Sequence, residues 1–309
     1  MKRKAFLILG LSLFGFSVAL ADINEGLVAY YPFEGNAQDA STNGLHGSNY
    51  TGGVTYSAGK LGQAAWFNGN SCLRLPMARL LDGESNATIS AWVLLSGGEG
   101  QILSAGDSRS GFDPITTRIS ASAAADVKFN QTATNTQTFI GFDNGDPIQG
   151  MSAGVWHLFT VILERQTTQS VFRCYLDANA VKMSTNASFS RIAYDADMPA
   201  IVGALDASSP WQFWNGGIDD LRIYNRVLSK SEILYLVSGG DPTLSITVSQ
   251  VRLCWNAPTN KASQLQYRSD FTGGNWSNLG PPIVEMGTIL CATNDVDQPN
   301  KFYRVIFLP

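Results

Sequence analysis

Charge is scarce in this chain, and the basic residues do not gather. Charged residues make up 15% of the 309-residue sequence, and beyond residue 4 Lys and Arg form no cluster. Proteins that bind nucleic acids or anionic membranes use dense positive patches. The sequence therefore argues against both as partners, and its 44% hydrophobic content predicts a folded, well-buried protein.

Long apolar runs are absent except at the N-terminus. Three basic residues at positions 2–4 precede an apolar stretch, and residues 19–21 (Ala-Leu-Ala) fit the small-residue rule for cleavage. We expect residues 1–21 to be a signal peptide cleaved near Ala21, with an uncleaved membrane anchor as the alternative. Because this segment carries no acidic residue, its removal changes the formal charge from −4 to −7. The mature chain is expected to be secreted or periplasmic, without insertion in a membrane.

Only four cysteines are present, and none forms a Cys-x-x-Cys pair, so we expect no zinc site. Disulfides persist in exported proteins. Cys254 with Cys291 is the favoured pair, because both lie on candidate strands of a small domain that gains stability from a cross-link. Cys72 with Cys174 is a second possible pair. Buried free thiols are the alternative for both pairs.

Helical periodicity is almost absent, whereas short strand patterns recur between turns rich in Gly, Asn, Asp and Ser. Alternation of apolar and polar residues predicts strands at 64–67, 87–94, 155–163 and 170–176. Many short strands in succession predict an all-β fold built as a sandwich.

One helix and a hinge mark the end of this β region. Ser229 and Glu232 have the spacing of a capping box, which predicts a helix over residues 231–237. The segment 238–242 contains Gly and Pro and predicts a domain boundary. We therefore divide the mature chain into a large domain (22–238) and a small β-sandwich (239–309). Strands are expected in the small domain at 244–248, 251–255, 264–269, 288–292 and 302–307.

Three segments of the large domain carry a family resemblance. They are residues 26–33 (GLVAYYPF), 61–69 (LGQAAWFNG) and 218–228 (IDDLRIYNRVL). With shorter matches in the same order, they resemble the laminin-G-like module of the concanavalin A-like lectin and glucanase superfamily. The resemblance covers residues 26–236 and implies a jelly-roll sandwich whose first and last strands lie side by side. It also implies binding, because members are adhesion modules, lectin-like domains and accessory domains of polysaccharide-degrading proteins.

Two details qualify the resemblances. Residues 177–179 read Asp-Ala-Asn where the family more often has Asp-Gly, and we expect Asn179 to take the left-handed conformation at this turn. The small domain looks like a fibronectin type III-like module, on the basis of scattered aromatic residues such as Trp255, Trp276 and Tyr303.

The laminin-G-like resemblance also implies a structural calcium ion, held by carboxylate and carbonyl oxygens where the first strand passes the last. By position, Asp219 would supply the ligand of the closing strand. Glu34 and the Gly35 carbonyl would lie opposite, and Asp39 is a weaker candidate. Strand alternation predicts that Asp219 and Asp220 point to opposite faces. The alternative is that these carboxylates cap turns or pair with nearby Arg side chains.

The sequence contains few of the residue patterns that catalysis requires. Glycoside hydrolysis needs two carboxylates that flank the scissile bond, and catalytic members of the superfamily usually carry them as Glu-x-Asp-x-(x)-Glu, a run that this sequence lacks. His46 and His157 are the only histidines, and we expect them to hold a loop and a strand position, not to serve a triad. The chain is therefore expected not to be an enzyme, with an atypical glycoside hydrolase or another polysaccharide-degrading enzyme as the alternative.

Exposed aromatic rings are the expected sugar contacts. Trp214 occupies the usual core position of the family, so Trp211 is the candidate for an exposed ring. Asp107 and Phe112 lie in a polar loop and complete the candidate ligand site. The alternative is that these residues only fill core and loop positions. We predict a secreted, non-catalytic protein that recognises an extracellular glycan or a surface protein. A structural or adhesive module of the cell envelope, without a small ligand, is the other alternative, and the sequence does not specify the oligomeric state.

Overall fold

The computed structural model describes residues 22–308 except 107–112, 121–124, 134–135, 147, 206–208, 240–249, 256–261, 269–274, 285–289 and 296–301. The chain divides into two compact units, Met1–Pro242 and Thr243–Pro309, and each is described by itself. The expected signal peptide (1–21) lies outside the described residues. Within the described part, no helix is long and apolar enough to cross a membrane.

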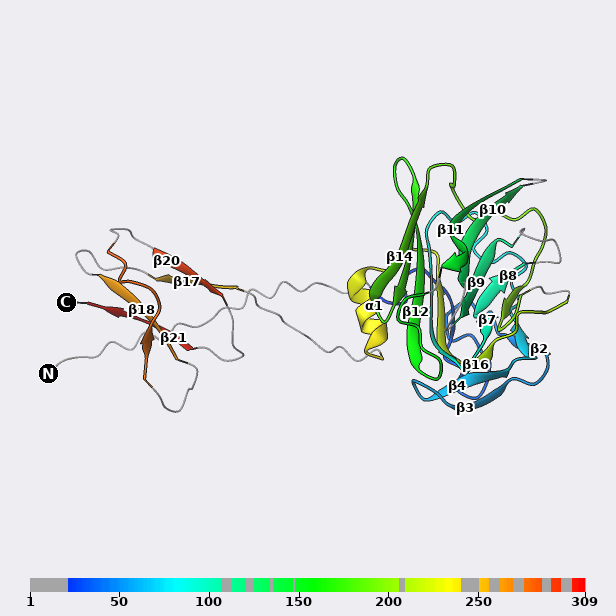
Figure 1. Cartoon of the computed structure of the whole chain (residues 1–309), viewed down its shortest axis with the longest axis horizontal. Helices are drawn as coiled ribbons and strands as arrows, with labels where there is room; N and C mark the ends of the chain where they lie inside the picture. The colour runs from blue at the N-terminus through cyan, green and yellow to red at the C-terminus, as the bar shows by residue number, and fades with distance from the viewer. Residues whose placement is uncertain are drawn as a thin grey trace. The chain divides into compact units, whose positions relative to one another are not determined.

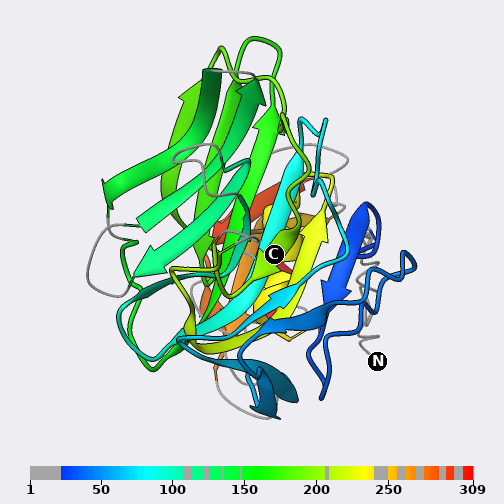
Figure 2. The same cartoon turned by 90° about the vertical axis from the view of Figure 1, so that its right-hand side faces the viewer.

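The larger unit consists of two antiparallel sheets of eight strands each, stacked as layers (Figures 1 and 2). The order in the first sheet is β14-β13-β12-β6-β16-β4-β3, and β1 also pairs with β16. The second sheet runs β11-β10-β9-β8-β15-β5-β2, and β7 pairs with β9. The prediction of an all-β sandwich is confirmed.

The bounds of the strands follow. The first sheet contains β1 (Leu27–Tyr31), β3 (Thr55–Ala58), β4 (Gln63–Asn68), β6 (Ala87–Leu95), β12 (Trp156–Arg165), β13 (Ser170–Leu176), β14 (Asn179–Asn186) and β16 (Asn215–Tyr224). The second contains β2 (Ser48–Thr51), β5 (Cys72–Arg74), β7 (Glu99–Gln101), β8 (Leu103–Ala105), β9 (Ile115–Ser120), β10 (Ala125–Ala133), β11 (Thr136–Asp146) and β15 (Ala200–Val202).

The main core lies between the two sheets. Alternate residues of each strand point inward, so the apolar half of each strand pattern meets the opposite sheet. Trp214, Tyr31 and Phe129 are each at most 1% exposed and belong to one continuous apolar cluster. Each large side chain of this kind stabilises the fold by roughly 1.5–3 kcal/mol. Trp214 therefore fills a core position, as its place in the sequence predicted.

The first and last strands of the larger unit are hydrogen-bonded neighbours, which confirms the central prediction. β1 pairs antiparallel with the end of β16, from Leu27 opposite Tyr224 to Tyr31 opposite Leu221. Figure 2 shows the blue first strand beside the yellow last one. On its other side β16 pairs with β6 and carries an extra residue between Asp219 and Arg222. The last strand of the larger unit therefore lies between β1 and β6, with the bulge at Asp220 and Leu221.

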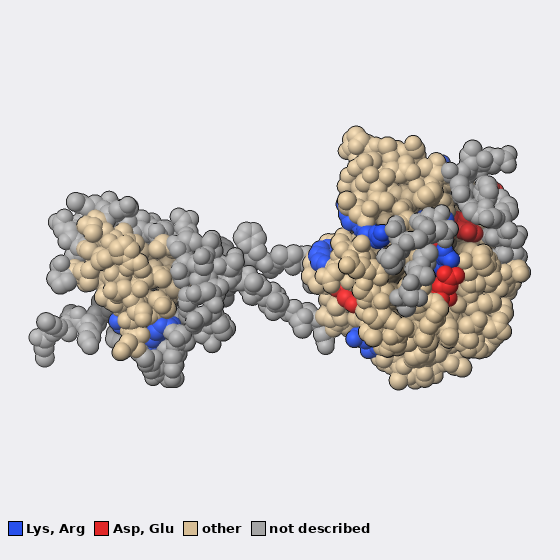
Figure 3. All heavy atoms as spheres, viewed as in Figure 1, with Lys and Arg blue, Asp and Glu red and all other residues tan. Residues whose placement is uncertain are grey.

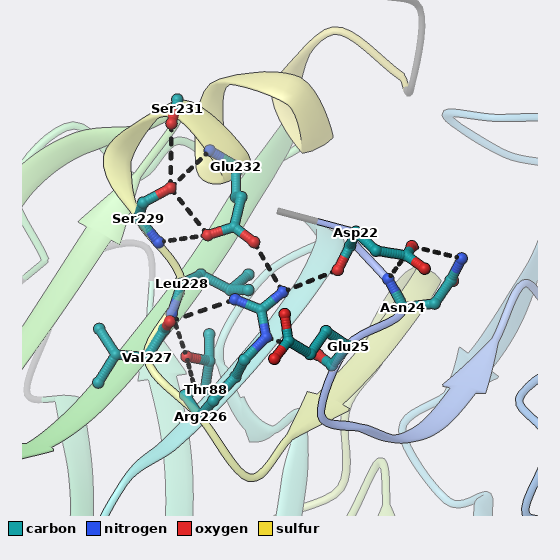
Figure 4. A network of polar contacts seen from close by, with 10 residues as sticks. All are labelled: Asp22, Asn24, Glu25, Thr88, Arg226, Val227, Leu228, Ser229, Ser231 and Glu232. Carbon is teal, nitrogen blue, oxygen red and sulfur yellow. Dashed lines mark hydrogen bonds and ion pairs between the residues drawn. The ribbon is translucent and has the colours of Figure 1, made fainter. Parts of the chain in front are cut away.

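A polar network around Arg226 fastens this closure (Figure 4). The guanidinium donates to the carbonyl of Glu25 at 2.5 Å and to that of Asp22 at 3.3 Å. It also pairs with Glu232 at 2.6 Å. Thr88 of β6 donates to the Arg226 carbonyl at 2.7 Å. One side chain thus joins the start of the described chain, the end of β16 and the helix that follows.

That helix, α1 (Lys230–Val237), begins as the sequence predicted. Both hydrogen bonds of the capping box between Ser229 and Glu232 are present. Gly239 follows the helix at φ +76°, a conformation that favours glycine. Ile233 and Leu228 are buried in a second apolar cluster, which α1 shares with Trp92 on the outer side of the first sheet.

Two expectations for the larger unit are wrong. The left-handed residues of the turn between β13 and β14 are Asp177 (φ +50°) and Ala178 (φ +62°), while Asn179 already starts β14. Two consecutive residues with positive φ make the two-residue turn whose twist suits a hairpin. Cys72 and Cys174 are free, buried thiols, so the second possible disulfide is not formed. They lie in different sheets and different apolar clusters.

The smaller unit contains two small sheets. β17 (Gln250–Trp255) pairs with β20 (Leu290–Asp295). β18 (Ser263–Arg268) lies between β19 (Ser277–Asn278) and β21 (Phe302–Phe307). Cys254 lies directly opposite Cys291 in the register of the first pair, and their disulfide stays a prediction. The strand expected at 244–248 lies outside the described residues.

Candidate binding face

The outer side of the second sheet carries a row of polar residues. Ile115 and Ile119 of β9 are buried in the core, so alternation turns Thr116 and Arg118 to the outer side. On β10, Val127 and Phe129 are in the core in the same way. The polar residues of the two strands face each other in register, with Thr116 opposite Lys128 and Arg118 opposite Asp126. We call this set, Thr116, Arg118, Asp126, Lys128 and Asn130, the β9–β10 face.

Four of these five polar side chains are buried, and Asp126 is partly exposed; burial of polar groups is unusual for the outer side of a sheet. The Lys128 ammonium lies 3.1 Å from Asp126, and Arg118 lies 3.2 Å from Glu99 of the neighbouring β7. Figure 3 shows basic and acidic atoms close together near the middle of a surface made mostly by uncharged residues. The ion pairs leave the face without a strong net charge.

Two neutral atoms of the β9–β10 face have unused hydrogen-bonding capacity. Thr116 Oγ1 and Asn130 Oδ1 are buried, and neither has a hydrogen-bond partner within the described structure. The amide nitrogen of Asn130 donates to the Asp113 carbonyl. An unsatisfied buried polar group costs about 1–3 kcal/mol, so a bound water or ligand is the usual reason that such a group persists.

Trp211 lies beside this face and is 52% exposed, as expected. Its backbone exchanges two hydrogen bonds with Leu205, of 2.9 and 3.0 Å. The next residue, Gln212, takes φ +49° and accepts a side-chain hydrogen bond of 3.0 Å from Gln101. Gln101 belongs to β7 and lies opposite Arg118 of β9. The exposed indole is therefore anchored one strand away from the β9–β10 face.

The other two candidate ligand residues, Asp107 and Phe112, lie outside the described residues. The residues on either side of their segment, Gly106 and Asp113, are close together. A Cβ atom on Gly106 would lie 2.1 Å from the Asp113 carboxylate and 3.1 Å from the Leu205 side chain. Gly106 thus lies near both Asp113 and Leu205, whose backbone is hydrogen-bonded to Trp211. The role of all three residues in binding stays a prediction.

The carboxylates expected to bind calcium lie mostly against backbone amides. Asp219 is fully buried, and its Oδ2 accepts hydrogen bonds from the amides of Lys60 and Leu61 at 2.9 and 2.8 Å. Glu34 accepts one from the amide of Gln63, at 3.1 Å to each oxygen. Both acids therefore cap the turn between β3 and β4. Asp219 Oδ1 has no partner in the described structure, and burial raises the pKa of this carboxyl to about 7.

Asp39 serves its own loop. Its carboxylate accepts hydrogen bonds from the amides of Tyr30, Ser41 and Leu45, and its amide donates to His46 Nδ1 at 3.1 Å. Burial acts to raise the pKa of Asp39, but these hydrogen bonds outweigh it and lower the pKa. His46 thus fixes the loop, as expected. His157 likewise holds a strand position, 2.7 Å from Asp177.

Gly35 takes φ +77° in the turn that follows β1. Simple alternation does not apply to Asp219 and Asp220, because Asp220 forms the bulge at φ +51°. Asp220 accepts a hydrogen bond from Tyr30 at 2.5 Å and pairs with Arg222 at 3.1 Å. No three metal-ligating side chains gather anywhere in the described part of the chain. Asp219 and Glu34 both accept hydrogen bonds from the turn between β3 and β4, and Asp219 Oδ1 has capacity left for a cation. Calcium binding by these residues stays a prediction.

Sequence reasoning missed the β9–β10 face. A partial signal was present, because polar and apolar residues alternate over residues 125–130 of β10, whereas Thr117 interrupts the alternation in β9. We predicted no strand in this part of the sequence, and alternation alone does not show that outward side chains will be buried.

Residues 67–234 match the family model of the concanavalin A-like lectin/glucanases superfamily, Laminin_G_3, over more than half of the chain. The chain belongs to this family. No curated protein matches the sequence. We refer to the larger unit from here on as the laminin-G-like domain.

Solved structures share the fold of the laminin-G-like domain. One is domain 4 of AbnA, a GH43 extracellular arabinanase from Geobacillus stearothermophilus, in complex with arabinotriose. It is 20% identical with a TM-score of 0.51, over 68% of this chain and 98% of that one. Another is the binding domain of Paraclostridial Mosquitocidal Protein 1, 12% identical with a TM-score of 0.53, over 92% of this chain and 76% of that one. At these identities the likeness shows the fold.

Proposed function

We propose that the laminin-G-like domain binds an extracellular glycan at the β9–β10 face and does not cleave it. The observation that carries the proposal is the pair of buried, unused oxygens, Thr116 Oγ1 and Asn130 Oδ1, with the exposed Trp211 anchored one strand away from the face. Sugars present many hydroxyl groups and apolar C–H faces. A few fixed polar atoms next to an aromatic ring are the combination that binds such a molecule.

The comparison with domain 4 of the arabinanase supports the ligand class. That domain was solved with arabinotriose and matches over 98% of its length. A likeness at 20% identity does not select the sugar, so the proposal names a glycan and no particular monosaccharide. A protein ligand on a cell surface is the second outcome that the experiment below can reveal.

Binding without cleavage is proposed because the acids next to the face are paired with cations. A glycosidase needs one carboxyl group that stays protonated to act as a general acid. Glu99 lies 3.2 Å from Arg118, and Asp126 lies 3.1 Å from Lys128. Each of these acids therefore forms an ion pair with a basic residue of the face, which suits a structural role.

The remaining parts of the proposal concern the context of the domain. We propose export through the segment 1–21 and cleavage near Ala21, which would leave Asp22 close to Arg226 in the network of Figure 4. The smaller unit is proposed to be a fibronectin type III-like module that accompanies the binding domain. Its paired strands β17–β20 and β19-β18-β21 support a β module of some kind.

A glycan array tests the proposal directly. Purified protein comprising residues 22–309 is expected to bind a subset of glycans and to leave the same glycans intact on prolonged incubation. Trp211→Ala should weaken binding about tenfold or more, because truncation of a central aromatic contact commonly costs more than 1 kcal/mol. Leu234→Ala is the matched control, since Leu234 is 51% exposed on α1.

Three results would contradict the proposal. Cleavage of a bound polysaccharide would favour the enzyme. Binding to a surface protein with no glycan signal would favour the adhesive alternative. Equal affinity of Trp211→Ala and the unchanged protein would place the glycan elsewhere.

A further inference from the structure

A groove opens at one edge of the laminin-G-like domain, between strands β11 and β14. These strands are the end strands of the second and the first sheet, respectively. The groove has a volume of about 530 Å³, which lies within the usual range of small-molecule sites, about 300–1,000 Å³. Its lining includes Thr138, Phe139, Gly141, Ser184, Thr185 and Asn186.

The floor of this groove is fixed by bonds between side chains and backbone. The amide of Gly141 donates to Ser184 Oγ at 3.1 Å, and Asn186 Nδ2 donates to the Phe139 carbonyl at 2.8 Å. Gly141 takes φ +144°, and a Cβ atom there would lie 2.2 Å from the Val127 carbonyl oxygen. β11 and β14 are therefore held at a set distance without forming a ladder. A preformed site of this kind loses little entropy when a ligand binds.

The lining is neutral and rich in hydroxyl groups. None of the side chains that line the groove carries a charge. Phe139 is 40% exposed at its rim. The Lys128 ammonium lies 5.6 Å from the centre of the Phe139 ring, which helps to hold the ring in place.

We propose that this groove is a second binding site on the domain and that it takes a neutral oligosaccharide. Hydroxyl and amide groups match sugar hydroxyls, and the ring at the rim matches a sugar C–H face. A charged ligand would lose hydration without gaining a counter-charge in the lining. The inference shares its ligand class with the proposed function. The groove adjoins the β9–β10 face, because Phe139 lies opposite Asn130, but Ser184 and Thr185 of β14 line the groove and do not belong to that face.

Calorimetric titration with neutral trisaccharides, arabinotriose among them, tests the inference. The unchanged protein is expected to show two sites. Thr185→Arg places a long charged side chain in the groove and should weaken one site about tenfold or more. Met183→Arg is the matched control, because Met183 lies on the same strand, is 69% exposed and does not line the groove. Phe139→Ala should weaken the same site as Thr185→Arg.

The dissociation constant of the groove site should change less than about twofold between about 0.01 M and about 1 M salt, although the screening length falls roughly from 30 to 3 Å. Retention of both sites in Thr185→Arg would overturn the groove and leave the proposed function standing. Retention of both sites in Trp211→Ala would overturn the proposed function and leave the groove site standing. The absence of any neutral sugar binding would overturn both.

Discussion

Antiparallel strands form two edges of the laminin-G-like domain, which differ in how they are joined. One, the sealed edge, is closed by a hydrogen-bonded strand pair, and the other, the open edge, contains a groove. At the sealed edge, β1 pairs along the end of β16, and Arg226 joins their ends to α1. At the open edge, β11 and β14 meet through only a few bonds between side chains and backbone, around a groove. Polar atoms at the sealed edge stabilise the fold. At the groove, Ser184 and Asn186 hold the strands, and the hydroxyl groups of Thr138 and Thr185 are the groups we propose for the ligand.

The largest effect on stability is expected at the sealed edge. Arg226→Met removes the partner of Glu232, which is only 3% exposed. Breaking a buried ion pair by removing one partner commonly costs about 3–5 kcal/mol. Ser229 still donates two hydrogen bonds to Glu232, so we expect the low end of this range. Chemical unfolding should show a loss of this size in the transition of the laminin-G-like domain.

The double variant Arg226→Met with Glu232→Gln should recover part of that loss, since the lone charge is then absent. Arg79→Met is a control, because Arg79 pairs with Asp82 and Asp197 on the exposed surface. An unfolding midpoint that does not move in Arg226→Met would show that the sealed edge does not depend on the network.

Asp219 makes the free energy of unfolding of the laminin-G-like domain depend on pH. Burial raises the pKa of this carboxyl in the folded protein to about 7, against about 3.9 in an unfolded chain. The folded state therefore holds a proton that the unfolded state has lost. The stabilisation from this proton is complete below about pH 4 and disappears as the pH rises through about 7, by an amount of about 4 kcal/mol at most.

Asp219→Asn should flatten that part of the pH–stability profile, which thermal melts between these limits can measure. The same melts test the calcium prediction. An ion at Asp219 Oδ1 would raise the melting temperature of the unchanged protein on addition of calcium and leave Asp219→Asn unaffected. A profile with the same slope in both proteins would contradict the assigned pKa.

The smaller unit offers a third pair of strands for comparison. Cys254 and Cys291 are opposite each other on β17 and β20, whereas Cys72 and Cys174 are free thiols. Thiol labelling of the denatured, unreduced protein should therefore modify two cysteines and not four. Reduction of the predicted disulfide should destabilise the smaller unit by about 2–4 kcal/mol. Four labels would show that the pair is not bonded.

The smallest change in stability is expected from a substitution at the β9–β10 face. It should stabilise the fold and weaken glycan binding. Thr116→Val removes an unpartnered hydroxyl and should stabilise the domain by about 1 kcal/mol while it weakens glycan binding. Thr117→Val is the matched control. Its hydroxyl donates to the Leu103 carbonyl and accepts from the Leu103 amide, so its loss should destabilise by about 1–3 kcal/mol. Unchanged affinity in Thr116→Val would remove this face from the site.

The features that could be predicted from the sequence are those that depend on patterns of neighbouring residues. The capping box of Ser229 and Glu232, the core position of Trp214 and the strand patterns all depend on residues close together in the chain. The pairing of β1 with β16 was available only through the family resemblance, since no local pattern joins residues almost 200 positions apart.

Features that depend on the meeting of distant segments were not predictable. The bulge at Asp220 interrupts the alternation of side chains along β16. This strand pairs with three others, β1, β4 and β6, which lie far from it in the sequence. The groove combines residues 138–141 with residues 184–188, which lie in different sheets. The partners of Asp39 were likewise not evident from the sequence, because its carboxylate accepts hydrogen bonds from amides of its own loop.

Amide chemical shifts, followed while a neutral trisaccharide that binds is added, test the contrast between the two edges most directly. The account predicts changes at residues 116–130 around the β9–β10 face and at residues 138–141 and 184–188 around the groove, with none along the paired strands β1 and β16. Changes that concentrate on β1 and β16, with the face and the groove unaffected, would contradict it.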